Sequence, residues 1–129
     1  MPSERKHAHG MVIEVATRFA AERSAPMRGL WFFAYTITIT NVGDEPARLL
    51  RRRWVITDAE GRVEHVEGDG VVGETPRLAP GEQFSYTSGC PLRTPFGSMS
   101  GTYAMVRDDG RAFDADVPEF RLLQPHALN

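Results

Sequence analysis

The feature that most constrains this chain is an alternation of apolar and polar residues with a period of two. Its clearest stretch runs from Leu30 to Asn41, where aromatic and branched residues occupy one face and threonines the other. Met11 to Phe19 and Gln83 to Cys90 alternate in the same way. No segment carries a convincing apolar stripe at the spacing of about 3.6 residues that a helix requires. The pattern therefore predicts a chain of half-buried β-strands.

Turn-forming residues separate these strands. Asp58 to Gly61 and Asp108 to Gly110 are short enough for hairpin turns, and Asn41 to Pro46 predicts a longer loop. Seven or eight strands, with turn signals about every 8 to 12 positions, are typical of an antiparallel β-sandwich. The fold class expected from the pattern is therefore all-β.

The length predicts one domain. A chain of 129 residues can bury a core without disulfides or metals. Residues 1–9 show no periodicity, so we expect a flexible N-terminal tail there and a single domain over residues 10–129.

Charge and cysteine content limit the classes of function. Lys plus Arg total 15 and Asp plus Glu total 17, a net charge of −2 that predicts neither nucleic-acid binding nor attraction to a membrane. Arg48 and Arg51 to Arg53 precede Trp54, but in a strand their side chains divide between two faces. No run of about 18 apolar residues occurs, so no membrane insertion is expected. The lone Cys90 predicts a reducing, cytoplasmic compartment.

Several motifs follow one another between Ile56 and Met105. They are Ile56 to Asp58, Gly68 to Glu74, Leu78 to Glu82, Tyr86 to Cys90 and Thr94 to Met105. Together they resemble the bacterial ApaG family, with a looser likeness from Met11 to Leu123. The resemblance implies an immunoglobulin-like or fibronectin-III-like sandwich and an association with cobalt and magnesium resistance. It also implies related domains in eukaryotic F-box and DNA-polymerase-interacting proteins, but it supplies no reaction.

The glycine-rich motif invites a binding hypothesis. Gly68 to Gly73 has the G-x-G-x-x-G spacing that binds dinucleotides when its last glycine opens a helix. Pro76 and Pro80 prevent such a helix, and the neighbouring carboxylates would repel a phosphate. Three interpretations remain: the glycines allow tight backbone packing, their amides form an anion-binding nest, or the carboxylates hold a divalent cation. The candidate binding residues are Gly68, Asp69, Gly70, Gly73 and Glu74.

A second candidate loop runs from Thr94 to Gly101. It presents the apolar residues Phe96 and Met99 among small and turn-forming ones. Apolar side chains on a loop can anchor a partner protein or fold back over the end of the core. Both interpretations stay open.

The sequence gives little support for a catalytic site or a metal site. Cys90 or Ser88 would need a base nearby, and His65 is the only histidine outside the terminal segments. Cys90 shares an alternating face with Tyr86, which predicts a small buried residue rather than a nucleophile. The acidic clusters lack the histidine or cysteine spacing of a metal site. We therefore expect no catalytic residue, no metal ligand and no cofactor.

The sequence thus favours a non-enzymatic binding module that presents the two loops to an unidentified partner protein. The alternative is a small-ligand binder that takes a pyrophosphate-like anion or a divalent cation at Gly68 to Glu74. A homodimer formed through an exposed sheet edge is a further expectation.

Overall fold

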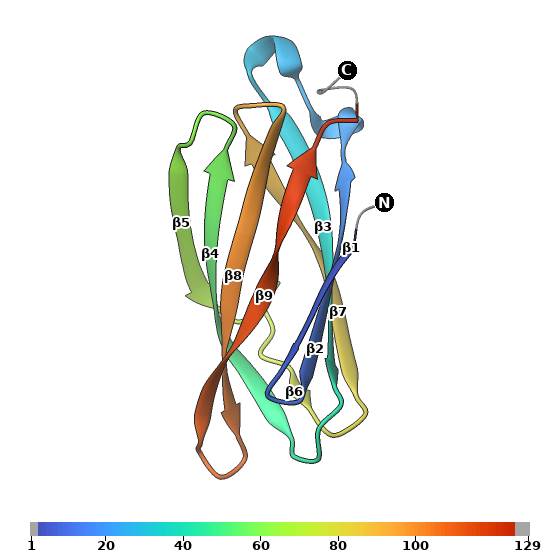
Figure 1. Cartoon of the computed structure of the whole chain (residues 1–129), viewed down its shortest axis with the longest axis vertical. Coiled ribbons are helices and arrows are strands. Elements are labelled where there is room, and N and C mark those ends of the chain that lie inside the picture. The colour runs from blue at the N-terminus through green and yellow to red at the C-terminus, as the bar shows by residue number, and fades with distance from the viewer. Residues whose placement is uncertain (1–2, 126–129) are drawn as a thin grey trace.

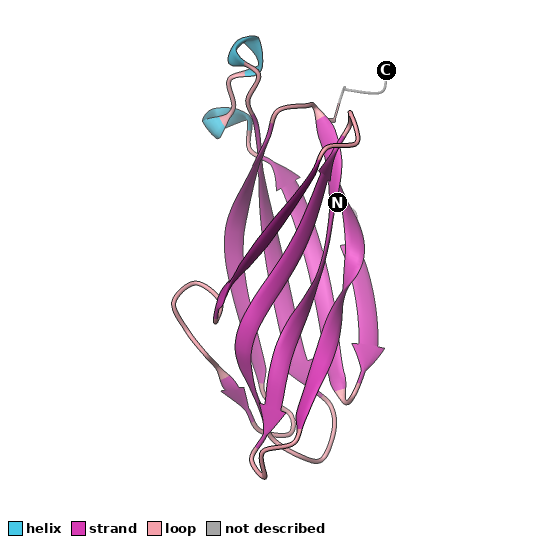
Figure 2. Cartoon of the chain, turned by 90° about the vertical axis from the view of Figure 1, so that its left-hand side faces the viewer, coloured by secondary structure: helices cyan, strands magenta, loops and turns pink. Residues whose placement is uncertain are grey.

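Residues 3–125 of the computed structural model form two antiparallel sheets packed face to face (Figures 1 and 2). One sheet has the order β1-β2-β3-β7 and the other β5-β4-β8-β9, with β6 paired to β4. The strands are β1 (Ser3–Ala8), β2 (Met11–Phe19), β3 (Trp31–Asn41), β4 (Ala47–Asp58), β5 (Val63–Asp69), β6 (Arg77–Leu78), β7 (Gln83–Leu92), β8 (Phe96–Arg107) and β9 (Ala112–Leu123). Two single 3-10 turns, η1 (Ala21–Arg23) and η2 (Pro26–Arg28), precede β3. The predicted all-β sandwich is confirmed, with nine strands in this described part of the chain instead of seven or eight.

The N-terminal segment is a strand rather than the flexible tail expected over residues 1–9. Ser3–Ala8 pairs with β2, and His9 and Gly10 connect the two strands with φ angles of 55° and 76°. Positive φ at both central residues is typical of the tightest hairpins. The prediction was wrong for residues 3–8 because the side chains of residues 4–7 are all exposed, so no alternation marks the strand. Residues 1–2 and 126–129 of the predicted tail and domain lie outside the described residues.

Aromatic side chains from both sheets meet at the centre of the sandwich. The Trp54 ring lies edge-on to the rings of Tyr35, Tyr103 and Phe120, with centroids 5.6, 6.1 and 6.0 Å away. All four side chains are buried, and Tyr35 comes from the sheet opposite the other three. Each such pair contributes about 0.5–1.5 kcal/mol beyond the burial of its apolar area.

A bulge in β4 decides which of its residues enter this core. The register between β4 and β8 shifts between Leu49 and Arg51. One extra residue reverses the alternation of side chains. Leu49 before the bulge and Trp54 after it are therefore both buried, although one position is odd and the other even. The same shift places Arg52 on the core side and Arg51 and Arg53 on the outer face, so the basic run does divide between two faces.

The two long sides of the sandwich differ. On one side β9 contacts β1 and β2, and the Lys6 ammonium lies 3.4 Å from the Asp116 carboxylate. On the other side the sheets end in β5 and β7, and within residues 3–125 neither has a further strand along its outer edge. The sandwich is therefore closed along β1 and β9 and open along β5 and β7.

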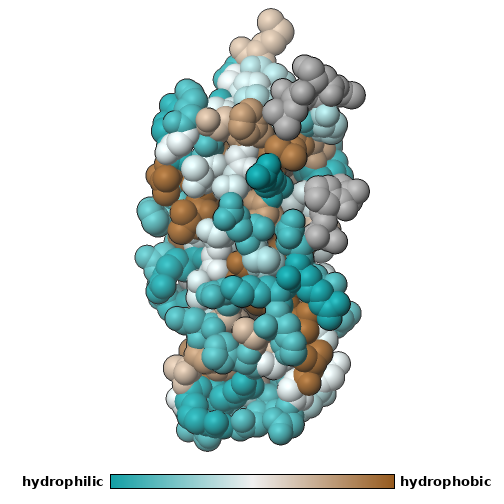
Figure 3. All heavy atoms as spheres, viewed as in Figure 1, coloured by the Kyte–Doolittle hydropathy of each residue, from teal (hydrophilic) through white to brown (hydrophobic). Residues whose placement is uncertain are grey.

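Polar side chains cover most of the outer surface of the second sheet. On the face seen in Figure 3 the apolar residues form small separate patches. Arg51 and Arg53 pair there with Asp69 and Glu67 of the neighbouring strand. No helix among residues 3–125 has the length and hydropathy needed to cross a bilayer.

Candidate functional site

The glycine loop ends in a tight turn whose outer amides are already bonded. The Val71 N–H donates to the Glu74 carbonyl at 2.8 Å, and the Glu74 N–H donates to the Val71 carbonyl at 2.9 Å. Between them Val72 and Gly73 have φ angles of 43° and 82°, the geometry of a type I′ turn. The Val71 side chain is fully buried and anchors the turn in the core. An anion could reach the Val71 and Glu74 amides only by breaking these bonds.

Gly70 stands where the backbone leaves no room for a side chain. Its φ is 62°, and its N–H donates to the Leu50 carbonyl at 2.8 Å. A Cβ atom at this position would collide with the carbonyl oxygen of Glu74. The middle glycine of the motif is therefore required by the backbone itself.

Gly68 makes space for the guanidinium of Arg52. A Cβ atom on Gly68 would lie 2.8 Å from that group. Arg52 Nη1 donates to the carbonyls of Asp69 at 3.1 Å and Gly70 at 3.0 Å. Arg52 thus ties the loop to β4, which explains the first glycine of the motif by packing rather than by a ligand.

The carboxylates near the loop are spread over exposed ion pairs. Asp69 pairs with Arg51 at 2.8 Å, Glu67 pairs with Arg53 at 3.2 Å, and the Glu74 side chain is exposed. Among residues 3–125 no group of three or more His, Cys, Asp or Glu side chains is arranged to hold a metal ion.

The two predicted loops lie at different levels of the sandwich. Asp69 is paired with Arg51 near the start of β4, whereas Gly97 is paired with Asp58 at its end. These seven residues of strand correspond to about 23 Å. The structure therefore does not bring the loops together into one site.

The predicted Thr94 to Gly101 loop is mostly strand. β8 begins at Phe96, whose side chain is half-buried. Met99 is only 1% exposed and belongs to the core, so its assignment to a binding loop is wrong. The cause is the alternation within β8, which points Met99 between the sheets.

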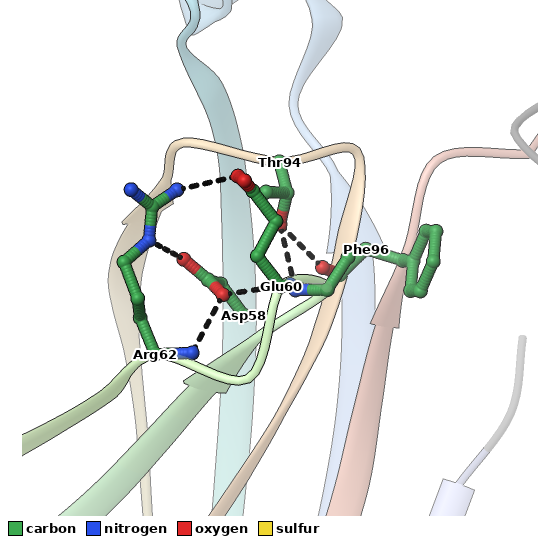
Figure 4. A network of polar contacts seen from close by, with 6 residues as sticks. Asp58, Glu60, Arg62, Thr94 and Phe96 are labelled. Atoms are coloured by element: carbon green, nitrogen blue, oxygen red, sulfur yellow. Dashed lines mark hydrogen bonds and ion pairs between the residues drawn. The ribbon is translucent and has the colours of Figure 1, made fainter.

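A polar network joins the β4–β5 turn to the β7–β8 turn (Figure 4). The Thr94 hydroxyl accepts from the Ala59 N–H at 3.0 Å and donates to the Phe96 carbonyl at 2.7 Å. In Figure 4 the Phe96 ring points away from this network. Phe96 is thus a half-exposed side chain fixed at its backbone rather than a free loop tip.

Asp58 holds the β4–β5 turn. Its carboxylate accepts from the N–H groups of Glu60 and Arg62 and from Arg62 Nε, at 2.9, 3.0 and 2.8 Å. Burial alone would raise the pKa of Asp58, but the hydrogen bonds from Arg62 and Glu60, together with the charge of Arg62, hold the pKa below its usual value. The turn therefore keeps its carboxylate ionised at neutral pH.

The residues considered for nucleophilic catalysis lie apart. Cys90 is buried in the core, and burial together with the charge of Glu64 raises the pKa of its thiol to about 12. His65 is exposed on β5, opposite Val55 and on the outer face. A thiol with that pKa is protonated at neutral pH, so Cys90 has the properties of a core residue.

A concave feature lies on the open side of the sandwich, away from the glycine loop and beside the β7–β8 turn that contains Thr94. It is a groove of about 470 Å³ between the start of β5 and the end of β7. Its lining residues are Gly29, Leu30, Ile56, Asp58, Arg62, Val63, Glu64, Pro91, Leu92 and Arg93. Met27, on the turn that precedes this lining, is fully exposed. An apolar floor with a few charged groups at its walls is typical of binding sites.

No motif in the sequence predicts this groove. Its walls come from the β2–β3 connection, the β4–β5 hairpin and the end of β7. Leu30 and Leu92 lie far apart in the sequence, and the pairing of β3 with β7 brings them together. The nearest signal is Pro91, because proline inside a strand pattern indicates a sheet edge.

Comparison with known proteins gives the family. A model of the ApaG domain matches residues 21–107. The chain is 55% identical to Protein ApaG of Anaeromyxobacter dehalogenans over 120 residues, which cover 93% of this chain and 94% of the relative. It is 53% identical to Protein ApaG of Pseudomonas aeruginosa, over 94% of this chain and 96% of the relative.

Solved structures share the architecture. A crystal structure of a Bordetella pertussis protein, 49% identical, superposes with a TM-score of 0.87 and covers 90% of this chain and 94% of its own. The C-terminal domain of wzt, 8% identical, superposes with a TM-score of 0.53 over 98% of this chain and 87% of its own, and shares the fold alone. Because the domain model covers residues 21–107 and the relatives are more than half identical over nearly the whole chain, this protein belongs to the ApaG family.

Proposed function

We propose that this protein is a non-enzymatic binding module and that its ligand is another protein, which docks on the open side of the sandwich. The observation that carries the proposal is the groove of about 470 Å³ between β5 and β7. Two sheet edges flank it, and the fully exposed Met27 lies on the connection that forms its upper wall. Exposed apolar groups beside a groove with charged walls are typical of protein interaction sites.

The location differs from the two loops expected from the sequence. Met99 is in the core, and the glycine loop is tied to β4 by Arg52. The groove, in contrast, offers backbone edges as well as apolar side chains, and a polypeptide is the ligand that can use both.

The small-ligand alternative has weaker support. The amides of Gly70, Val71 and Glu74 donate within the protein, and the Asp69 carboxylate is paired with Arg51. We propose that any link to cobalt and magnesium resistance, which the family resemblance implies, runs through the partner protein.

Photo-crosslinking in cells tests the proposal. A photoreactive residue in place of Arg93, which lines the groove, should capture one defined protein. The matched control replaces Thr38 on the outer face of β3, where no docking is expected. After identification, the purified partner should bind the Met27→Asp/Arg93→Glu double variant about tenfold more weakly than the wild type, since both changes lie in the docking surface.

Two outcomes would contradict the proposal. Equal capture from positions 93 and 38 would show that the contact is not specific to the groove. Saturable movement of the Gly68 to Glu74 amide signals on adding magnesium, cobalt or pyrophosphate, with no partner captured, would favour the small-ligand alternative instead.

A further inference from the structure

Within residues 3–125, the hydrogen-bond pattern of β5 leaves one set of its backbone groups without a partner strand. The Asp58 N–H donates to the Arg62 carbonyl at 3.0 Å, and the Gly70 N–H donates to the Leu50 carbonyl at 2.8 Å. Bonded positions alternate along an antiparallel pair, so the even-numbered residues of β5 face β4. The N–H and C=O groups of the odd-numbered residues therefore point away from the sheet. They belong to Val63, His65, Glu67 and Asp69, and among these the Asp69 carbonyl already accepts from Arg52 Nη1.

The edge of β7 across the groove is less able to accept a strand. The Asn41 N–H donates to the Glu82 carbonyl at 2.9 Å, so even-numbered residues of β7 face β3 and odd-numbered ones face outward. Pro91 is one of the outward positions and has no N–H to offer. β5 contains no proline, so its edge is the one that can continue its sheet at the level of the groove.

Glu64 gives this edge a chemical preference. It pairs with Ile56 in the β4–β5 register, on the same face as Trp54 and Val66, and therefore lies on the groove side of β5. The other two carboxylates of the strand, Glu67 and Asp69, are on the outer face and paired with arginines. Among the residues that the structure describes, Glu64 forms no ion pair.

The other charged groups of the groove do not neutralise Glu64. Arg62 is held by Asp58 at 2.8 Å and by Glu60 at 2.9 Å. Arg93 follows β7 on the opposite wall and is exposed. A strand added along β5 lies next to Glu64, because cross-strand neighbours on one face are about 5 Å apart.

From this arrangement we infer that the partner supplies an extended segment that pairs with the free edge of β5 and places a lysine or arginine beside Glu64. The inference rests on the proposed function and names the chemistry of its partner. In an extended segment, the residue two positions from the cation lies on the same face as the cation and therefore also faces the groove. We expect this residue to be apolar, because it would cover Ile56 and Leu92. Main-chain bonds to Val63, His65 and Glu67 supply affinity, and the cation supplies specificity.

A peptide selection tests this inference. The intact protein is used to select from a phage library of random peptides about twelve residues long. We expect the selected peptides to contain lysine or arginine two positions from an apolar residue. Binding of a selected peptide should weaken about tenfold with Glu64→Lys, and a peptide with glutamate in place of the cation should bind that variant better than it binds the wild type.

Glu14→Lys is the matched control. Glu14 is also exposed on a strand, but on the outer face of β2, so this change alters net charge equally and should leave peptide binding unchanged. Bound peptide should also slow hydrogen exchange at the amides of Val63, His65 and Glu67, and not at those of β7.

Several results would overturn the inference. They are selection of no peptide, selection without enrichment of cations, equal effects of the two lysine variants, or protection of β7. A dimer in sedimentation with these β5 amides protected in the absence of peptide would show that a second copy occupies the edge. In each case capture of a partner through position 93 would still support the proposed function, so the two failures are distinguishable.

Discussion

At the scale of single residues, the glycine motif is explained by folding. Gly68 makes room for Arg52, Gly70 avoids the Glu74 carbonyl, and Gly73 adopts the positive φ of a type I′ turn. Each requirement is local and different. A spacing that resembles a nucleotide motif therefore arises here from two packing constraints and one turn conformation, without a helix.

Gly70→Ala should destabilise the protein more than Gly73→Ala. Both glycines have positive φ, but a Cβ meets rigid backbone only at Gly70 and nothing within 4 Å at Gly73. We expect a loss of about 1–2 kcal/mol for Gly73→Ala from the strained φ alone, and about 3 kcal/mol or more for Gly70→Ala. Urea unfolding measures both, and equal losses would show that the close approach to Glu74 is unimportant.

At the scale of elements, the edge strands differ in how they are protected. β1 covers the outer edge of β2 with a strand whose residues 4–7 are polar and exposed, and Lys6 of β1 reaches across to Asp116 of β9. β7 has Pro91 at its free edge, whereas β5 carries charged side chains but keeps its backbone donors and acceptors. Charge and proline both discourage edge-to-edge pairing, but only proline removes a donor.

A chain that begins at Gly10 should be less stable and prone to associate. Loss of β1 leaves the edge of β2 unpaired and uncovers Val12, which is only 3% exposed in the intact chain. We expect the free energy of unfolding to fall by about 1–3 kcal/mol. Light scattering should detect concentration-dependent association, because exposed strand edges pair with one another.

Lys6→Ala is the control for this truncation. It removes only an exposed ion pair, so it should change stability by less than about 1 kcal/mol. If the truncated chain behaves like Lys6→Ala, β1 contributes no more than its ion pair.

At the scale of the whole molecule, one hydrogen bond between buried tyrosines links the two sheets. Tyr86 of β7 and Tyr103 of β8 have their hydroxyl oxygens 2.5 Å apart. Burial is the main cause that raises the pKa values of Tyr35, Tyr86 and Tyr103 above their usual value. The neutral hydroxyls are therefore part of the folded state, and folding and tyrosine ionisation oppose each other.

Stability should fall steeply at alkaline pH. The pKa of each buried tyrosine is higher in the folded state than in the unfolded state. The stability that its neutral hydroxyl contributes is therefore fully present below the unfolded pKa of about 10 and is lost as the pH rises above that value. Each buried tyrosine should lower the free energy of unfolding by about 1.4 kcal/mol per pH unit in that range. Urea unfolding between about pH 8 and 11 measures the slope. Tyr86→Phe should reduce this slope by the contribution of one tyrosine. An unchanged slope would refute the proposed coupling between folding and tyrosine ionisation.

The sequence alone determined the fold class, because alternation is a local property of half-buried strands. Phe33, Ile37 and Ile39 share a buried face as their spacing predicts. It also indicated that Cys90 is a core residue, since Tyr86 and Cys90 share a face in the same strand. The family resemblance, confirmed by the comparisons, rested on motifs that can likewise be found without a structure.

Only the tertiary structure decided the parts that depend on pairing between distant segments. The bulge after Leu49, which turns Trp54 inward, is set by the register with β8. Strand β1 escaped detection because both its faces are solvated, and Met99 was misplaced because a residue near a turn can already lie inside the sandwich. The open groove between β5 and β7 likewise depends on pairing between distant segments. Its lining comes from three separated segments, and burial and exposure there are properties of the assembled sheets rather than of any one stretch of sequence.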